Sequence, residues 1–215
     1  MNGLASRIKG VTVDLDGTLV DTVNLHVECW VNAFMSNGYK IDPVNVEPLV
    51  GMATPKLIKT LIGNVNDQIL ERIDLEHKSL FMEKMSQVSA FSDAKPALEL
   101  LHKEGMKIAV ASSTRYKMAE TILEKTGLAQ FVDSIVGGDE VLMGKPDPEI
   151  YIEAFKRLDV SPRMGAVVGD TEYDAIPARK IGALAIVVRR DGNSVNQADL
   201  LMSNLLDVAA ELLNA

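Results

Sequence analysis

The sequence predicts an α/β protein: a doubly wound parallel β-sheet with an all-helical segment inserted after its first strand. Two patterns predict this fold class. After residue 90, short apolar segments rich in β-branched residues alternate with amphipathic segments, which is typical of a parallel sheet with helices on both faces. Between residues 24 and 89, apolar residues recur at three- and four-residue spacing and strand signals are scarce, which favours helices.

The elements can be placed in chain order from these patterns. The first strand is expected at Ile8–Asp14, which is apolar and enriched in β-branched residues. Helices are then expected at residues 26–38, 54–63 and 67–85. The later elements are a helix at Pro96–Lys103, a strand at 106–112, a helix at 117–127, a strand at 133–138, a helix at Glu149–Leu158, a strand at 165–170, a helix near Ile176–Gly182, a strand at 183–188 and a C-terminal helix at 200–213.

This order of elements predicts two domains. Residues 1–20 and 90–215 would form the core domain around the sheet, and residues 21–89 an inserted helical domain. The segment FSDAKP marks the return to the core.

Composition narrows the class of protein. The chain has 215 residues, a formal net charge of −8 and a pI of about 4.9, so its surface would repel a phosphate backbone and we expect no nucleic-acid partner. No apolar run reaches membrane-spanning length, and the first ten residues, MNGLASRIKG, lack the apolar stretch of a signal peptide. The single cysteine, Cys29, excludes an internal disulfide and suits a reducing compartment. We therefore expect a cytoplasmic protein without a membrane partner, as a monomer or weak dimer.

Polar residues follow four of the predicted strands. Asp14 ends the first strand, Ser112 ends the segment 106–112, and Asp170 ends 165–170. Lys145 lies just beyond the short strand 133–138. In open α/β sheets, ligands bind outside the carboxyl ends of the strands, so these four side chains are expected at one edge.

The acids at that edge predict a divalent cation. Asp14 and Asp16 are two residues apart and can point to the same side, where Asp170 adds a third carboxylate. Close carboxylates repel one another unless a cation intervenes. Mg²⁺ suits a few carboxylates together with a substrate phosphate, and Lys145 would supply a fixed positive charge.

The segment after the second core strand predicts an anion site. Ser112 is followed by Ser113 and Thr114, and a helix is expected to start near Arg115. Hydroxyls and free N–H groups at a helix N-terminus bind phosphate well. Together with the acids, they point to phosphoryl transfer, in which one carboxylate forms an aspartyl-phosphate and another carries the proton.

At this point the chain resembles a known family. The segments DLDGTLVD, ASS, GKPDPE and GDTEYD resemble the four motifs of the haloacid dehalogenase superfamily, in the order and spacing of the subgroup that has a helical cap after the first motif. The resemblance implies a Rossmann-like core with Asp14 as nucleophile and Asp16 as general acid/base. It places Ser112 and Lys145 on the phosphoryl group.

The resemblance also implies a set of supporting residues. Mg²⁺ would be held by Asp14, Asp170 and Asp16, the last through its backbone carbonyl. Asp174 would support the metal site, and Thr18, with Gly17, would form the turn that leads into a mobile lid. Ser113, His26 and Thr54 are expected on the substrate side of the cleft.

Within the family, the residues favour one activity. Asp16 argues against cleavage of carbon–halogen bonds and of phosphonoacetaldehyde, because related enzymes of those kinds lack an acid there. His26 and Trp30 match positions in β-phosphoglucomutase-like members, but Thr54 stands where those mutases have an arginine. GDTEYD resembles the phosphoglycolate phosphatase type. The favoured hypothesis is a phosphatase acting on a small phosphorylated metabolite, phosphoglycolate or a sugar phosphate. The alternatives are a phosphomutase and a non-catalytic phospho-aspartate sensor.

Several residues have simpler interpretations. Asp174 could serve only to interact with a helix dipole, and Ser112 could serve as a helix cap as well as a ligand. His26 could orient Asp16, line the cleft or pack between cap and core. Trp30 is expected to pack. His77 and His102 are expected at the surface, without a role in the site.

Overall fold

The fold is built on a six-stranded parallel sheet. The structure is a computed structural model that describes residues 8–190 and 195–214. Every strand pair is parallel, and the strand order is β3-β2-β1-β4-β5-β6. The strands are β1 (Gly10–Val13), β2 (Lys107–Ser112), β3 (Ser134–Gly137), β4 (Gly165–Gly169), β5 (Leu184–Val188) and β6 (Leu200–Met202).

The strand order reverses beside β1. The chain leaves β1 to build β2 and β3 on one side, and it then builds β4, β5 and β6 on the other. Val13 pairs with Val110 of β2 and with Val168 of β4, so the carboxyl ends of these three strands lie level. A reversal of this kind opens a crevice at the carboxyl ends, where doubly wound folds bind their ligands.

Helices cover both faces of the sheet because its strands are apolar on both sides. Val11 and Val13 face one side with Ile108 and Val110, and that side packs against α5, α6 and α9. The alternate residues of the strands face the other side and pack against α7 and α8. These helices are α5 (Ala94–Lys103), α6 (Tyr116–Thr126), α7 (Glu149–Leu158), α8 (Glu172–Ile181) and α9 (Leu205–Asn214). The predicted fold class is thereby confirmed.

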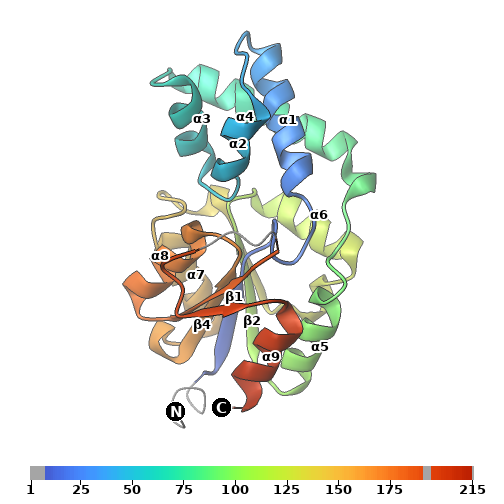
Figure 1. Ribbon diagram of the computed structural model, residues 1–215, viewed down its shortest axis with the longest axis vertical. Coiled ribbons are helices and arrows are strands. Elements are labelled where there is room, and N and C mark those ends of the chain that lie inside the picture. The colour runs from blue at the N-terminus through green and yellow to red at the C-terminus, as the bar shows by residue number, and fades with distance from the viewer. Residues whose placement is uncertain (1–7, 191–194, 215) are drawn as a thin grey trace.

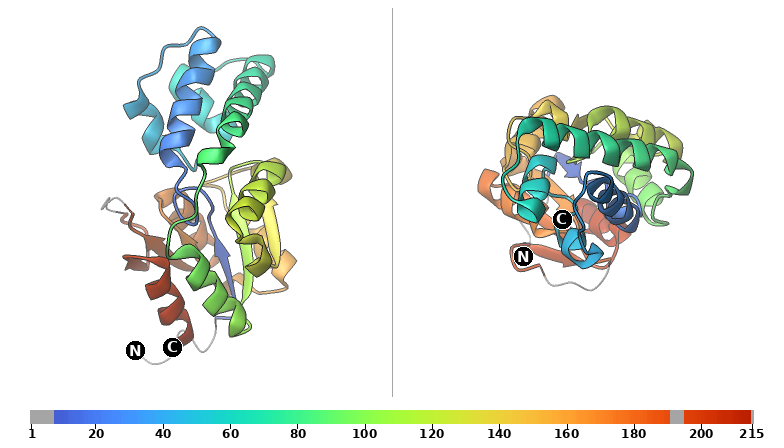
Figure 2. Two further views of the ribbon diagram at one scale, coloured as in Figure 1. Left: turned by 90° about the vertical axis from the view of Figure 1, so that its right-hand side faces the viewer. Right: turned by 90° about the horizontal axis from the view of Figure 1, so that it is seen from above.

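The segment between β1 and α5 is all helical, and we call it the cap. It lies beyond the carboxyl end of the sheet, in the upper part of Figure 1 and of the left view of Figure 2. It has a small apolar core of its own, which includes Trp30, Phe34 and Ile73. Its helices are α1 (Val23–Ser36), α2 (Pro43–Val46), α3 (Thr54–Ile62) and α4 (Asp67–Glu83).

Two linker segments join the cap to the core, and they lie side by side. Val20 forms an antiparallel bridge with Ala90. Hydrogen bonds of 3.0 Å on either side of this bridge join Asp21 N to the Ser89 carbonyl and Phe91 N to the Leu19 carbonyl. The paired linkers leave and re-enter the core together, and the division into domains at residues 20/21 and 89/90 stays a prediction.

Short 3₁₀ turns complete the chain. The turn η2 (Glu47–Leu49) directly follows α2, and neither α2 nor η2 was expected from the sequence. Asp42 and Pro43 are nevertheless a helix-start signal, because the Asp42 carboxylate accepts a hydrogen bond from Val44 N at 3.1 Å. The other turns are η3 (Met85–Gln87), η4 (Ala129–Phe131), η5 (Gly138–Glu140) and η6 (Pro162–Met164).

The expectation of one helix over residues 200–213 was wrong. Leu200–Met202 form strand β6, which pairs with Ile186–Val188, and the helix begins only at Leu205. Asn204 separates the two elements, because its side-chain oxygen accepts a hydrogen bond from Asp207 N at 2.9 Å. A run of three apolar residues fits the end of a helix and a short strand equally well, and only the free edge of β5 decides between them.

The structure bears on two further expectations. Within residues 8–190 and 195–214, no helix combines the length and apolar character that crossing a membrane requires. Most of the segment MNGLASRIKG, which the sequence predicted to lack signal-peptide character, lies outside the described residues, because the description starts at Ile8.

Candidate active site

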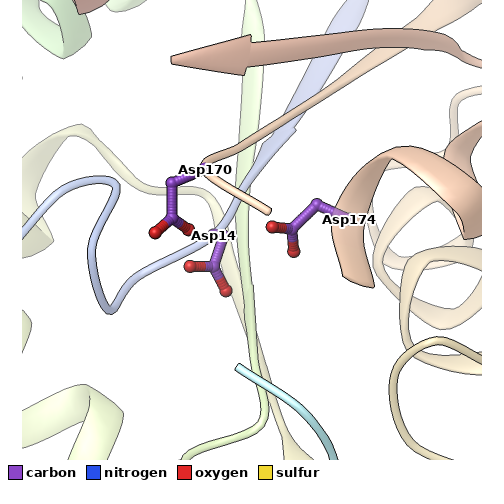
Figure 3. A group of neighbouring side chains, drawn as sticks. All are labelled: Asp14, Asp170 and Asp174. Carbon is purple, nitrogen blue, oxygen red and sulfur yellow. The ribbon is translucent and has the colours of Figure 1, made fainter. Parts of the chain in front are cut away.

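Asp14, Asp170 and Asp174 form a compact group of carboxylates at the carboxyl ends of β1 and β4. One oxygen from each lies within 4.8 Å of one from each of the others. Figure 3 shows the three carboxyl groups converging from two strand ends and the first turn of α8. The predicted convergence of Asp14 and Asp170 therefore holds in the structure, and Asp174 joins them.

Two glycines allow this close approach. Gly17 has φ +85°, and a Cβ at this position would come 2.3 Å from Oδ2 of Asp170. At Gly169, a Cβ would come 2.2 Å from Cγ of Asp174. Any side chain at either position would push a carboxylate out of the group.

Lys145 is the buried cation of the group. It is fully buried, and its Nζ donates hydrogen bonds to Oδ1 of Asp14 and, at 2.8 Å, to Oδ1 of Asp174. The hydroxyl of Tyr151, on α7, donates to the same Asp174 oxygen at 2.6 Å. Burial opposes the charge of Lys145, but Asp14 and Asp174 raise its pKa well above the ordinary value.

One lysine does not balance three acids. Burial raises the pKa of Asp14 to about 7; Lys145 opposes this rise, and Asp174 and Asp16 add to it. Burial, with the charges of Asp14 and Asp174, also raises the pKa of Asp170 well above its usual range. Asp174 differs, because Lys145 and its hydrogen-bond donors lower its pKa against the effect of burial. The three acids therefore resist being ionised together unless further positive charge joins Lys145.

This donor set fits a hard divalent cation. Three carboxylate oxygens close together, on a fixed backbone cradle and short of positive charge, are what Mg²⁺ needs from a protein. Thr18 supports the group from beside it, because its hydroxyl donates to Oδ1 of Asp170 at 3.2 Å. Asp174 therefore stands as a candidate ligand rather than only a supporting residue, and it also caps α8 through hydrogen bonds with Thr171.

The carboxylate of Asp16 lies outside this group and has only donors around it. Thr22 Oγ1 donates to Oδ1 at 2.7 Å, and His26 Nε2 lies 3.0 Å from the same oxygen. Ser112 Oγ and Thr114 Oγ1 donate to Oδ2 at 3.1 and 2.8 Å. Burial alone would raise the pKa of Asp16, but His26 and the hydrogen bonds hold it below its ordinary range. As a metal ligand, Asp16 could offer its backbone carbonyl, not this carboxylate.

A cavity of about 50 Å³ lies between the two acids and the cap. From the core it is lined by Asp14, Asp16, Ser112 and Ser113. From the cap it is lined by a second set: His26, Trp30, Val50, Gly51, Met52, Thr54, Leu57, Asp74, His77 and Lys78. The predicted substrate residues His26 and Thr54 thus reach the same cavity as the predicted catalytic residues.

The cap touches the core around this cavity. Arg115, the residue before α6, donates two hydrogen bonds to Oδ2 of Asp74 on α4, at 2.7 and 3.1 Å. This pair also borders an outer cleft of about 830 Å³ between α3, α4 and residues 138–144. Other hydrogen bonds between cap and core include Ser113 Oγ to the Gly51 carbonyl at 2.7 Å, Ala53 N to the Lys145 carbonyl at 3.2 Å and Tyr173 Oη to the Pro48 carbonyl at 2.9 Å.

One surface expectation was wrong. His77 is 5% exposed and its Nε2 lies 3.0 Å from Nδ1 of His26, whereas His102 is exposed as expected. The sequence held a signal for this burial, because His77 lies at four-residue spacing between the apolar residues Ile73 and Phe81 on one face of α4.

Fold and site together define a class: a doubly wound enzyme with a helical cap and an acidic centre at the strand ends. A family model described as haloacid dehalogenase-like hydrolase matches residues 11–188. The chain belongs to this family of hydrolases, as the four motifs indicated.

Known proteins agree with this assignment over nearly the whole chain. A plasmid-encoded phosphoglycolate phosphatase of Cupriavidus necator is 30% identical over 186 residues, covering 83% of this chain and 80% of that protein. The β-phosphoglucomutase of Bacillus subtilis is 27% identical over 216 aligned positions, covering 96% and 94%. Among solved structures, a hydrolase from Pseudomonas syringae superposes with a TM-score of 0.87 at 26% identity, covering 95% of this chain and 97% of that one.

Proposed function

We propose that this protein is a Mg²⁺-dependent phosphatase that hydrolyses a small phosphorylated metabolite through an aspartyl-phosphate on Asp14. The observation that carries the proposal is the setting of Asp14: a buried carboxylate beside Lys145, with Asp170 and Asp174 near enough to share a cation. The relative from Cupriavidus necator, named as a phosphatase, supports the same reaction class.

The reaction would run in two displacements. In the first, a carboxylate oxygen of Asp14 attacks phosphorus, the bond from phosphorus to the leaving oxygen breaks, and Asp16 gives that oxygen a proton. In the second, water loses a proton to Asp16 and attacks phosphorus, and the bond to Asp14 breaks to release phosphate. Asp16 is ionised in the substrate-free protein, and the negative charge of an arriving phosphate favours its protonation.

We propose that Mg²⁺ is held by the carboxylates of Asp14, Asp170 and Asp174 and by the backbone carbonyl of Asp16. When bound, the cation would neutralise charge on the phosphate and among the carboxylates. Ser112, with the N–H groups that follow it, and Lys145 would then bind the phosphoryl oxygens.

The cavity bears on the size of the substrate. About 50 Å³ has room for little more than the transferred group, so a short leaving group such as that of phosphoglycolate fits with least rearrangement. A sugar phosphate would require the Arg115–Asp74 pair to separate and to open the way to the outer cleft. We propose that the enzyme acts in the cytoplasm as a monomer or weak dimer.

A phosphomutase is the second candidate. The relative from Bacillus subtilis is named as one. His26, whose position matches a histidine of β-phosphoglucomutase-like proteins, contacts Asp16. Thr54, which lines the cavity in place of an arginine, favours the phosphatase because it offers no charge to a second phosphate. Product analysis separates the two: a mutase isomerises its substrate, needs a bisphosphate and releases little free phosphate.

The test is release of inorganic phosphate from a panel of phosphorylated metabolites with Mg²⁺ present. We expect turnover that stops on chelation with EDTA and returns with added Mg²⁺, and that is lost in Asp14→Asn. Asp21→Asn, a matched change at an exposed acid, should keep wild-type turnover. Full activity of Asp14→Asn, or full activity after chelation, would overturn the proposal.

A further inference from the structure

Four aromatic rings from the cap form two stacked pairs beside Asp16. Trp30 lies on His77 with ring centroids 3.7 Å apart and planes 9° apart. His26 lies on Phe81 at 4.3 Å, and the two imidazoles lie edge to edge, with centroids 5.2 Å apart and planes 20° apart. All four side chains are buried. Packing against Trp30 and Phe81 leaves each imidazole ring little freedom to tilt.

Hydrogen bonds join His77 to His26 and His26 to Asp16. Oδ1 of Asp16 lies 3.0 Å from Nε2 of His26, and Nδ1 of His26 lies 3.0 Å from Nε2 of His77. Oδ1 of Asp16 already accepts a hydrogen bond from the Thr22 hydroxyl, so we assign the proton between Asp16 and His26 to Nε2 of His26. His77 therefore contacts the far nitrogen of the ring that faces the acid.

His77 can serve His26 in either of its protonation states. If His26 is neutral, its Nδ1 accepts a hydrogen bond and His77 donates from Nε2. If His26 is protonated, its Nδ1 donates and His77 accepts at Nε2, having moved its own proton to the other nitrogen. Burial and the neighbouring His26 lower the pKa of His77, so it remains a neutral imidazole that can play both parts. A lysine or arginine at this position could only donate.

We propose that His77 is a positioning residue for the acid/base group: it holds the His26 ring so that Nε2 remains directed at Asp16. This rests on the proposed role of Asp16 in the phosphatase reaction. His77 also lines the cavity, but its hydrogen bond among the described residues is to His26, so any effect of His77 on Asp16 would pass through His26.

A purely structural role for His77, as a packing partner of Trp30, makes a different prediction. His77→Phe keeps an aromatic ring for the stack and removes the hydrogen bond. His77→Gln loses the ring but has an amide that can donate or accept near the position of Nε2. If packing matters, phenylalanine is the better substitute; if positioning matters, glutamine is.

The experiment measures kcat and KM of both variants on two substrates, phosphoglycolate and para-nitrophenyl phosphate. The leaving oxygen of the first is strongly basic and needs a proton; that of the second leaves as a stable phenolate. We expect His77→Phe to lower kcat/KM on phosphoglycolate by about tenfold or more, with a smaller loss on the aryl ester. The ratio kcat/KM is compared because it reports the steps up to departure of the leaving group, whereas kcat also includes hydrolysis of the aspartyl-phosphate, which is common to both substrates. His77→Gln should recover most of that loss, and His102→Gln, the matched change at an exposed histidine, should behave as wild type.

Equal losses of kcat/KM on the two substrates, wild-type kcat/KM in His77→Phe, or no recovery in His77→Gln relative to His77→Phe would overturn the inference. Thermal unfolding of each variant shows whether a loss of activity comes from unfolding of the protein. The two substrates are compared with the same protein preparation. Asp16→Asn separates the two levels of the argument. If that variant shows no preference between leaving groups, or wild type shows no turnover, the proposed function fails; if it shows the preference and the His77 variants do not, only this inference fails.

Discussion

Asp14 and Asp16 are separated by one residue, and their side chains lie in opposite surroundings. Around Asp14 are two further acids and one lysine, and its pKa rises to about 7. Around Asp16 are a histidine and three hydroxyls, all able to donate, and its pKa falls. Asp14 thus lies where positive charge is lacking, and Asp16 lies where hydrogen-bond donors are plentiful.

The difference supports the different roles that we propose for the two acids. Asp14 lies where a cation and a phosphate can be brought together, which suits a nucleophile. Asp16 is held by groups from both cap and core, so its position depends on how the cap sits. The core alone builds the first environment, while the second needs His26 from α1.

The largest expected effect comes from removing the one cation on the Asp14 side. Lys145→Met leaves Asp14 and Asp174 buried without their shared donor, which should cost about 3–5 kcal/mol of the free energy of unfolding. Urea unfolding measures this cost, and phosphate release should fall with it. Lys180→Met, at an exposed lysine, is the matched control. A variant as stable as wild type would contradict the charge balance described for this side.

The next effect concerns pH. Because the pKa of Asp14 is raised from 3.8 to about 7, the metal-free folded protein binds a proton more tightly than the unfolded chain between these values. Its free energy of unfolding should therefore fall as pH rises through this window. Mg²⁺ should reverse the loss, and so stabilise the protein more at about pH 8 than at about pH 5.

Urea unfolding at the two pH values, with and without Mg²⁺, checks this sign. Asp14→Asn should show a weaker fall with pH and a smaller gain from Mg²⁺, whereas Asp21→Asn should match wild type. Stability of the metal-free protein that rises with pH by the same amount in wild type and Asp14→Asn would show that Asp14 is not in the environment described.

The smallest effect expected is that of Tyr151→Phe. This change removes one of the donors to Oδ1 of Asp174 and leaves Lys145 in place, so we expect a loss of about 1 kcal/mol in the free energy of unfolding. Turnover should fall only a few-fold, with a higher Mg²⁺ requirement. Tyr39→Phe in the cap is the comparison. An unchanged Mg²⁺ requirement would separate Tyr151 from the metal site.

The Asp14 side could be predicted from the sequence, and most of the Asp16 side could not. Asp14 and Asp170 follow strands and Ser112 ends one, and parallel strands bring their carboxyl ends together, so alternation alone places them. Lys145 was placed there because it lies just beyond the predicted strand 133–138, and only Asp174 needed the motif pattern. The fold class and most elements followed from the same periodicities, and β6 did not because its three residues suit two structures.

The residues that surround Asp16 depend on how cap and core meet. Thr22 and Thr114 come from segments without a periodic signal, and the Arg115–Asp74 pair depends on the position of α4. The face of α4 that carries His77 could be read from spacing, but its contact with His26 requires α1 and α4 to pack side by side. Such contacts are set by tertiary packing and not by local pattern.

The most direct test of the division of work between the two acids is to locate covalent phosphate on the protein. Asp16→Asn is mixed with para-nitrophenyl phosphate and Mg²⁺, quenched in acid, digested and analysed by mass spectrometry. Our account predicts phosphate on Asp14, accumulating in Asp16→Asn because water is no longer activated, and none in Asp14→Asn. Phosphate on His26 in Asp16→Asn, phosphate on Asp16 in Asp14→Asn, or an equal amount of adduct in the two variants would contradict it.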